Sequence, residues 1–292
     1  MIVRGNETVL VHGITGTQAT FWSDKMKEYG TKVVGGLNPK KAGTEHLGLP
    51  VWASAKDAVA ASDGAIDCSC VIVPPAAVKP SVMDALDAGI KKIVILTEHI
   101  PVHDTMYFLS AAREAHASVI GPNTAGIVTP GECFVGFMPA FNERVFKPGN
   151  IGVISRSGSL GTLVCLNLVQ AGFGISAFVG IGGDPVIGTT TKDALQCLDE
   201  DPTTEAVAMV GEIGGGMEEA AAEYAKTMTK PIVSFIAGAA SPPGKKMGHA
   251  GAIVMGDKGS YAGKKDALEA AGVTVLSTPS NLPDVLKERL SA

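Results

Sequence analysis

A single histidine, His249, lies among small residues in the run Gly248-His249-Ala250-Gly251-Ala252-Ile253. An imidazole is nucleophilic near neutral pH, and small neighbours leave room for a bulky substrate to approach the ring. Upstream, the run Gly211-Glu212-Ile213-Gly214-Gly215 places a carboxylate between an apolar stretch and glycines. A carboxylate that holds one ring N–H fixes the tautomer and leaves the other nitrogen free to attack. The two runs therefore predict a covalent intermediate on His249, oriented by Glu212.

A turn rich in serine could hold a phosphate. The run Ser155-Arg156-Ser157-Gly158-Ser159-Leu160 follows an apolar stretch and opens a helix-like segment. Free backbone N–H groups and the positive end of a helix dipole favour an anion at such a turn. No lysine follows in the Walker A pattern, so the turn is not a P-loop. We expect Ser157, Gly158 and Ser159 to bind a phosphate that another group delivers, such as a phosphohistidine.

A second glycine turn lies near the N-terminus, in the run Gly13-Ile14-Thr15-Gly16-Thr17-Gln18. It follows an apolar strand and opens a helix, which again suits a phosphate. A site for NAD would also have an acidic residue about twenty positions further on. Lys40 and Lys41 occupy that region instead. This favours a ligand with an extra phosphate, and coenzyme A and NADP both fit.

The elements needed to position these residues alternate along the chain. Strands are expected at Thr8–His12, Lys32–Val34, Ala65–Val73, Lys92–Leu96, Ser118–Ile120, Ile151–Ile154, Ile175–Val179, Ala206–Val210, Pro231–Ile236 and Thr274–Leu276. Helices are expected at Gln18–Tyr29, Ala76–Ala88, Asp104–Ala115, Leu160–Gln170, Thr191–Asp199, Glu218–Met228 and Lys264–Ala271. Buried strands that alternate with helices indicate parallel sheets.

The chain is long enough for two domains, with 292 residues of which 46% are hydrophobic. A stretch rich in glycine and proline interrupts the alternation, and it reads as a hairpin and linker. The expected division is residues 1–122, a linker at 123–149, and residues 150–292. Each half is predicted to be an α/β domain with a doubly wound parallel sheet.

Composition excludes several functional classes. The net charge is −5, with lysine and arginine scattered and only 5% aromatic residues, so nucleic acid is not an expected partner. No apolar run reaches the length of a membrane span, and the first residues do not resemble a signal peptide. The cysteine count is odd and there is no Cys-x-x-Cys pair, so a disulfide framework is not expected and the protein is expected in the reducing cytoplasm. Cys68 and Cys70 are interpreted as small buried hydrophobic residues. His12 is expected to be packed and hydrogen-bonded, and no histidine has the spacing of a metal ligand.

Taken together, these runs resemble the α subunit of succinyl-CoA synthetase and related acyl-CoA ligases that form a nucleoside diphosphate. The likeness extends over the whole chain, and also includes Gly43-Thr44-Glu45-His46-Leu47-Gly48-Leu49-Pro50, Gly121-Pro122-Asn123, Gly180-Ile181-Gly182-Gly183-Asp184-Pro185 and Lys246-Met247 before Gly248. It implies a Rossmann-type CoA-binding domain followed by a flavodoxin-like domain. It also implies that a nucleoside triphosphate, a carboxylic acid and CoA give acyl-CoA, the diphosphate and phosphate.

The resemblance assigns roles to individual residues. His249 would carry the phosphoryl group and Glu212 would steady it, while Ser157–Ser159 would hold phosphate. CoA would lie on Thr15, Gly16, Thr17, Gln18, Lys41, Leu96, Thr97 and Glu98. The family also implies a β subunit with an ATP-grasp fold, in an αβ or α2β2 assembly. That subunit would bind ATP or GTP with magnesium and complete the pocket for the acid.

The residues expected around the acid depart from the family pattern. The usual Asn-Cys-Pro-Gly is Asn123-Thr124-Ala125-Gly126 here, and the positions of a tyrosine and a glutamate are Thr162 and Leu163. Asn123, Thr124 and Thr162 are the expected contacts of the acid. The chemistry on the histidine is thus expected to persist with a short dianionic acid: succinate, malate or sulfoacetate. The alternatives are a CoA-responsive regulatory protein and an NADP-dependent oxidoreductase.

Overall fold

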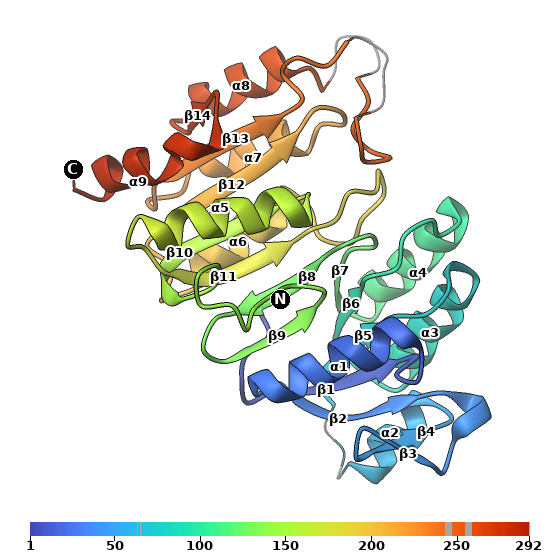
Figure 1. Ribbon diagram of the computed structural model, residues 1–292. Coiled ribbons are helices and arrows are strands. Elements are labelled where there is room, and N and C mark those ends of the chain that lie inside the picture. The colour runs from blue at the N-terminus through green and yellow to red at the C-terminus, as the bar shows by residue number, and fades with distance from the viewer. Residues whose placement is uncertain (63, 65, 243–246, 255–258, 292) are drawn as a thin grey trace. The chain divides into compact units, whose positions relative to one another are not determined.

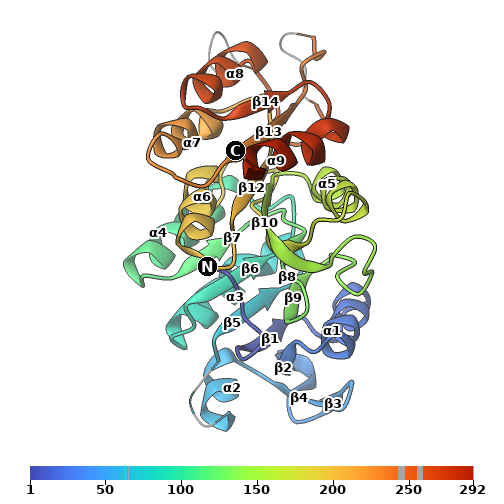
Figure 2. The same cartoon turned by 90° about the vertical axis from the view of Figure 1, so that its left-hand side faces the viewer.

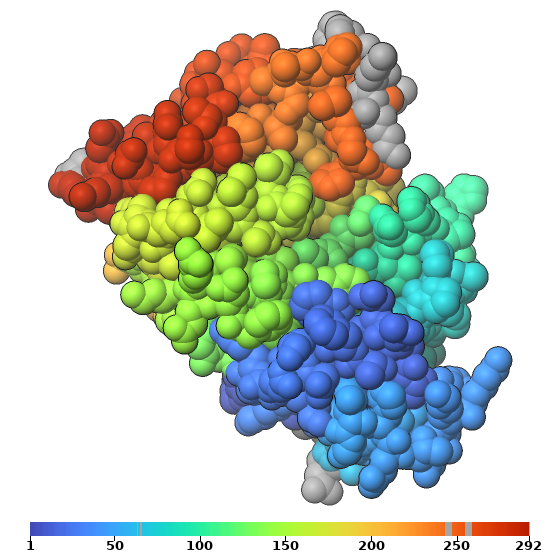
Figure 3. Space-filling view, in the orientation of Figure 1, coloured from blue at the N-terminus to red at the C-terminus, as the bar shows by residue number. Residues whose placement is uncertain are grey.

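The computed structural model describes residues 1–62, 64, 66–242, 247–254 and 259–291. Ala65 and Lys246, named above in an expected strand and in the histidine run, lie outside the described residues. The chain divides into two compact units, drawn as ribbons in Figure 1. The first comprises residues 1, 3–141 and 186–188, and the second comprises residues 2, 142–185 and 189–292. The outer surface of one face is drawn in Figure 3, coloured by residue number.

The first unit is built on a largely parallel sheet in the order β3-β4-β2-β1-β5-β6-β7. Its strands are β1 (Thr8–His12), β2 (Lys32–Leu37), β3 (Glu45–His46), β4 (Leu49–Trp52), β5 (Cys68–Val71), β6 (Lys92–Ile95) and β7 (Ser118–Ile120). Its helices are α1 (Thr17–Tyr29), α2 (Ala55–Ala61), α3 (Pro75–Asp87) and α4 (Val102–Glu114), with a 3-10 turn η1 (Pro39–Lys41). A hairpin of β8 (Gly126–Thr129) and β9 (Cys133–Gly136) completes the unit.

Both faces of this sheet are covered, which explains why its strands are continuously apolar. Helices α2, α3 and α4 pack on one face, where Leu10, Val71 and Ile95 are buried in a single cluster (Figure 2). Helix α1 lies on the other face beside the β8–β9 hairpin, with the rings of Trp22 and Phe134 edge to face at 6.5 Å. Cys68 and Cys70 of β5 are completely buried and free, as expected, and burial raises the pKa of Cys70 to about 12.

The second unit contains parallel strands in the order β14-β13-β12-β10-β11. They are β10 (Pro148–Ser155), β11 (Ile175–Gly180), β12 (Ala206–Glu212), β13 (Ile232–Ala237) and β14 (Thr274–Leu276). The helices are α5 (Gly158–Gln170), α6 (Thr191–Glu200), α7 (Met217–Ala225), α8 (Tyr261–Ala270) and α9 (Leu282–Ser291), with η2 (Pro279–Asn281) before α9. Helices α5 and α9 cover one face, and α6, α7 and α8 the other (Figure 2).

The predicted α/β fold with parallel sheets is confirmed, and every expected strand and helix has a counterpart among the described residues. The sequence did not indicate β3, β4, α2 or α9. Strand β4 contains Pro50, a residue that disfavours strands, so its sequence gives little indication of a strand. In the structure it pairs with β2 at only two positions. Within the described residues, no helix is both long and apolar enough to cross a membrane.

Candidate functional site

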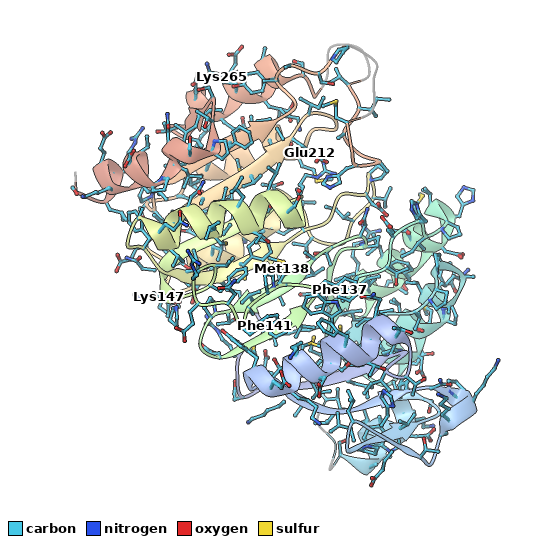
Figure 4. All side chains as sticks on the ribbon, viewed as in Figure 1. Phe137, Met138, Phe141, Lys147, Glu212 and Lys265 are labelled. Carbon is cyan, nitrogen blue, oxygen red and sulfur yellow. The ribbon has the colours of Figure 1, made fainter. Side chains whose placement is uncertain are left out.

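The predicted pair of Glu212 and His249 is brought into contact in the second unit. Glu212 ends β12 (Figure 4) and is only 5% exposed. Its Oε2 lies 2.6 Å from Nδ1 of His249, whose loop follows β13 in the chain. This contact selects the tautomer with the proton on Nδ1. Nε2 then keeps its lone pair, and it makes no hydrogen bond to any described residue.

Arg156, to which no role was assigned, is the second partner of this carboxylate. It directly follows β10 and is 4% exposed, and its Nη1 lies 3.2 Å from Oε1 of Glu212. Oε1 is buried and receives no hydrogen bond, so the contact is an ion pair without a well-directed N–H. The same guanidinium donates from Nη2 to the carbonyl of Asp184 at 3.1 Å. Arg156 therefore neutralises Glu212 and ties it to the loop after β11.

Glycines allow the histidine loop to approach so closely. A Cβ on Gly183 would lie 2.7 Å from Cγ of His249, and one on Gly214 would lie 2.2 Å from the carbonyl oxygen of Gly251. Gly214 also has a φ of +91°, a conformation that costs other residues energy. Gly183 and Gly214 thus leave space that the imidazole and the backbone of its loop occupy.

The predicted phosphate turn lies beside the imidazole. Ser157 is the N-cap of α5, and its Oγ accepts a hydrogen bond from the N–H of Leu160 at 3.4 Å and lies 3.2 Å from Oγ of Ser159. A cavity of about 290 Å³ has both serines, Glu212 and His249 in its wall. Gly158 begins the helix between the two serines. The cavity therefore joins a nucleophilic nitrogen to a helix N-terminus that favours anions.

In the first unit, the residues expected to bind CoA follow neighbouring strands. Thr15–Gln18 follow β1 and open α1, Lys41 ends η1 after β2, and Leu96–Glu98 follow β6. Because β2, β1, β5 and β6 are parallel, these segments share one edge of the sheet. Gly16, Thr17, Gln18, Lys41 and Glu98 are exposed, Thr15 and Thr97 are half-buried, and Leu96 is buried. A crevice outside the carboxyl ends of strands is where such sheets bind ligands.

Two side chains at this edge face inward. Thr15 accepts a hydrogen bond at Oγ1 from Nδ2 of Asn38 at 2.6 Å, and Thr97 donates from its hydroxyl to the carbonyl of Val73 at 2.7 Å. His12, the last residue of β1, is 2% exposed as expected, but the expected hydrogen bond is absent at Nε2, which has no partner. Burial lowers the pKa of His12 to about 4, so the ring is neutral near pH 7.

Comparison with known proteins decides the family. Residues 5–99 match the family described as CoA binding domain, and residues 154–274 match CoA-ligase. The chain is 47% identical over 290 residues to succinate–CoA ligase [ADP-forming] subunit alpha 2 of Archaeoglobus fulgidus, with 99% of each chain covered. The chain belongs to the α subunits of the acid–CoA ligases. It is also 42% identical to the ADP-forming sulfoacetate–CoA ligase subunit SauD of Bilophila wadsworthia, again with 99% of each chain covered.

A solved structure shares the fold of this ligase family member. The chain superposes on ATP citrate lyase of Methanosaeta concilii, in complex with (3S)-citryl-CoA, with a TM-score of 0.89 and 24% identity. All of this chain is covered and 52% of the lyase chain, so it spans about half the length of that protein. The Rossmann-type CoA-binding domain and the ligase domain predicted from the sequence are thereby confirmed.

The residues expected to contact the acid lie in different environments. Asn123 has a left-handed φ of 54° and donates its backbone N–H to the carbonyl of Thr97. Thr124 is 5% exposed and accepts a hydrogen bond at Oγ1 from the N–H of Gly126. Thr162, on the first turns of α5, donates its hydroxyl to the carbonyl of Gly158 at 2.8 Å. The neighbouring Leu163 is 40% exposed. The hydroxyl of Thr162 is therefore engaged by its own helix.

Proposed function

We propose that the chain carries a phosphoryl group on Nε2 of His249 during the synthesis of an acyl-CoA. The observation that carries this proposal is the 2.6 Å contact between Nδ1 of His249 and Glu212 at the wall of a cavity that also contains the N-terminus of α5. The carboxylate keeps the proton on Nδ1, so the lone pair of Nε2 can attack the terminal phosphorus of a nucleoside triphosphate. The P–O bond to the leaving diphosphate breaks as the N–P bond forms.

The acid then takes the phosphoryl group. A carboxylate oxygen of the acid attacks phosphorus, the N–P bond breaks, and the electron pair returns to Nε2. The CoA thiol loses its proton to solvent, its sulfur attacks the acyl carbon, and the C–O bond to the phosphate breaks, which releases phosphate. The serines at the start of α5 and the free N–H groups of its first turn stabilise the phosphate charge in each step.

CoA binds the first unit in this scheme. Thr15–Gln18 offer the N-terminus of α1 to the pyrophosphate, Lys41 is exposed beside the same sheet edge for a further phosphate, and Leu96–Glu98 form the neighbouring strand end. The family model for this unit is described as a CoA binding domain. Isothermal titration of the full chain should give binding of CoA and none of NADP or NAD; NADP binding in preference to CoA would contradict this assignment.

A partner subunit supplies the nucleotide. Relatives of 42–47% identity are named as subunits of a ligase, and the turn Ser157–Ser159 has no Walker A lysine after it. The partner is a β subunit of ATP-grasp fold that binds ATP or GTP with magnesium, in an αβ or α2β2 assembly. The chain alone should therefore form no ADP or GDP when it is supplied with acid and CoA.

The acid is short and carries a second anionic group. Relatives act, by their names, on succinate and on sulfoacetate. Thr162 and Leu163 replace the tyrosine and glutamate of the family pattern, so one negative charge is missing near the start of α5. The lost negative charge lowers the repulsion of any second anionic group, and the smaller Thr162 leaves room for the tetrahedral sulfonate, which is bulkier than a planar carboxylate. We therefore place sulfoacetate before succinate and malate.

The phosphohistidine is tested with the chain and its β subunit. Incubation with ATP labelled at the γ-phosphate should give acid-labile, base-stable label on the chain, and His249→Asn should abolish both label and turnover. His103→Asn, which alters an exposed histidine on α4, should label normally. Normal labelling and turnover by His249→Asn would refute the mechanism.

The acid is tested separately, by comparing kcat/KM for sulfoacetate, succinate, malate and citrate with the same complex. One or two contacts in a pocket discriminate by roughly ten- to two-hundred-fold. A tenfold preference for succinate over every other acid would overturn the choice of sulfoacetate and leave the phosphohistidine untouched.

A further inference from the structure

A completely buried ion pair lies next to Glu212, and neither of its residues lines the cavity. Glu218 in the first turn of α7 and Lys264 in α8 are both 0% exposed, and Nζ of Lys264 contacts Oε2 of Glu218. Oε2 of Glu219 lies 3.7 Å from the same Nζ. Neither Glu218 nor Lys264 is used by the chemistry proposed above.

The pair is connected to the histidine through the backbone. Oε1 of Glu218 accepts a hydrogen bond from the N–H of Glu212 at 3.2 Å, and the Glu212 side chain in turn holds Nδ1 of His249 at 2.6 Å. One carboxylate therefore bridges Lys264 and the residue that orients the imidazole. The path runs from α8 through α7 to the end of β12 and the histidine loop.

Burial of two charges is poor evidence of stabilisation. Removing two ions from water is costly, and apolar residues of similar volume often stabilise a fold as well or better. A glycine leaves room for the Glu218 side chain, because a Cβ on Gly211 would lie 2.8 Å from Oε1 of Glu218. The φ of Gly211 lies outside the left-handed region, so glycine is explained at this position by the space that it leaves for Glu218. The Glu218–Lys264 pair is costly to bury and fills space that Gly211 leaves open next to Glu212. We therefore looked for its role in the orientation of Glu212.

We propose that the Glu218–Lys264 pair positions Glu212 for phosphoryl transfer. The hydrogen bond from the Glu212 N–H fixes the backbone at the end of β12, and thereby the direction of the carboxylate that sets the tautomer of His249. Lys264 neutralises Glu218, and Arg156 neutralises Glu212. Each of these two carboxylates, which lie six residues apart in the sequence, therefore has a cationic partner. Both are positioning residues, since neither touches the reacting atoms. This inference rests on the phosphohistidine proposed above.

Two double variants separate the hydrogen bond from the charges. Glu218→Gln with Lys264→Met removes both charges but keeps an amide oxygen that can accept from the Glu212 N–H. Glu218→Leu with Lys264→Met removes the charges and the acceptor, with similar side-chain volume. Outer-shell partners that orient a metal-ligating histidine typically contribute about 10- to 100-fold to affinity or activity, and we expect the same range for a histidine that reacts. In the complex with the β subunit, we expect the Gln/Met variant to label His249 within about threefold of wild type and the Leu/Met variant to lose on the order of 10- to 100-fold.

A spectroscopic measurement does not depend on turnover. Ring ¹⁵N shifts of the full chain labelled in histidine, assigned with His249→Asn, report which nitrogen of His249 carries the proton. Wild type and Gln/Met should have it on Nδ1, whereas Leu/Met should shift toward the Nε2–H tautomer. Gly211→Ala, which displaces the end of the Glu218 side chain while keeping both charges, should shift in the same direction and tests the inference if Leu/Met does not fold.

The outcomes distinguish the two proposals. If Leu/Met and Gly211→Ala keep both the wild-type tautomer and the wild-type labelling rate, the pair is structural packing only and the inference is wrong. If wild type itself acquires no label, the phosphohistidine is wrong, whereas an Nδ1–H tautomer that depends on Glu218 would still support positioning of the His249–Glu212 contact.

Discussion

At the scale of single residues, the site depends on a carboxylate that is held from two directions. Arg156 lies at Oε1 of Glu212 and His249 at Oε2, and Nε of Arg156 also donates to the carbonyl of Gly182 at 3.4 Å. An ion pair at one oxygen and a hydrogen bond at the other restrain the carboxylate from rotating away from the imidazole. The tautomer of His249 is therefore determined before any ligand arrives.

Replacing Arg156 should damage both stability and chemistry. Arg156→Met leaves a buried carboxylate without its cation, and loss of one partner of a buried pair costs about 3–5 kcal/mol. Arg156→Lys should be intermediate, because a single ammonium cannot reach Glu212 and two carbonyls at once. Urea unfolding followed by circular dichroism measures the first effect and labelling of His249 the second. The exposed Arg113→Met is the control, expected within about 0.5 kcal/mol of wild type; an equal loss in both variants would contradict the assignment.

The sequence predicted the pairing of His249 with Glu212 but not the rest of this cluster. Both residues lie in runs of glycine, a local signal that a backbone turns or approaches closely. Arg156 lies in a serine-rich turn and Lys264 in an ordinary helix, where charged residues are usually exposed. Arg156 and Lys264 are buried because β10, α7 and α8 pack around β12. The spacing of residues along the sequence does not predict this packing.

At the scale of elements, the site is made by loops that follow parallel strands. Ser157 follows β10, Gly183 follows β11, Glu212 ends β12 and the histidine loop comes after β13. These strands are paired in parallel, so the four loops extend from the same edge of the sheet. The sheet fixes the bases of the loops, and glycines decide how closely the loops can meet.

Gly183→Ala should therefore impair chemistry more than stability. The added Cβ would lie 2.7 Å from Cγ of His249, so the ring must move, whereas the φ of Gly183 is outside the left-handed region and tolerates alanine. A displacement of about 1 Å at a reacting group can cost on the order of a hundredfold. We expect labelling of His249 to fall by on the order of 10- to 100-fold with an unchanged unfolding midpoint. Gly263→Ala in α8, which meets only a serine hydroxyl at 3.2 Å, is the control; equal labelling by both variants would show that the loop adapts.

Elements with a continuous apolar run were predictable, even the three-residue strands β7 and β14, whereas elements without such a run were not. Strand β12 is buried at every position and was expected from its apolar run. Helix α2 has only seven residues, too few for a reliable helical period. Helix α9 has Pro283 in its first turn, a position that proline tolerates but that resembles a break in the sequence.

At the scale of the whole molecule, the two units can be observed separately. Both tryptophans of the chain, Trp22 and Trp52, belong to the first unit. Tryptophan fluorescence therefore reports unfolding of the proposed CoA-binding unit, while circular dichroism reports both. This matters because a chain of two units need not unfold in a single transition.

The buried His12 should make the first unit sensitive to acid. Burial lowers its pKa to about 4 from an ordinary 6.5, so between these values the unfolded chain binds a proton that the folded unit excludes. The stabilisation is complete above pH 6.5 and is lost as pH falls toward 4, by about 2 kcal/mol at pH 5 and about 3 kcal/mol in all. The variant His12→Leu has no group that can titrate at this position. Leucine is compatible with the apolar neighbours Leu37 and Val71 on the adjacent strands. Urea unfolding followed by fluorescence at pH 7 and pH 5 should show wild type losing about 2 kcal/mol relative to His12→Leu. As a control, His103→Leu at an exposed position should lose the same stability as wild type between pH 7 and pH 5. If the free energies of unfolding of wild type and His12→Leu depend equally on pH, the folded unit does not exclude a proton from His12.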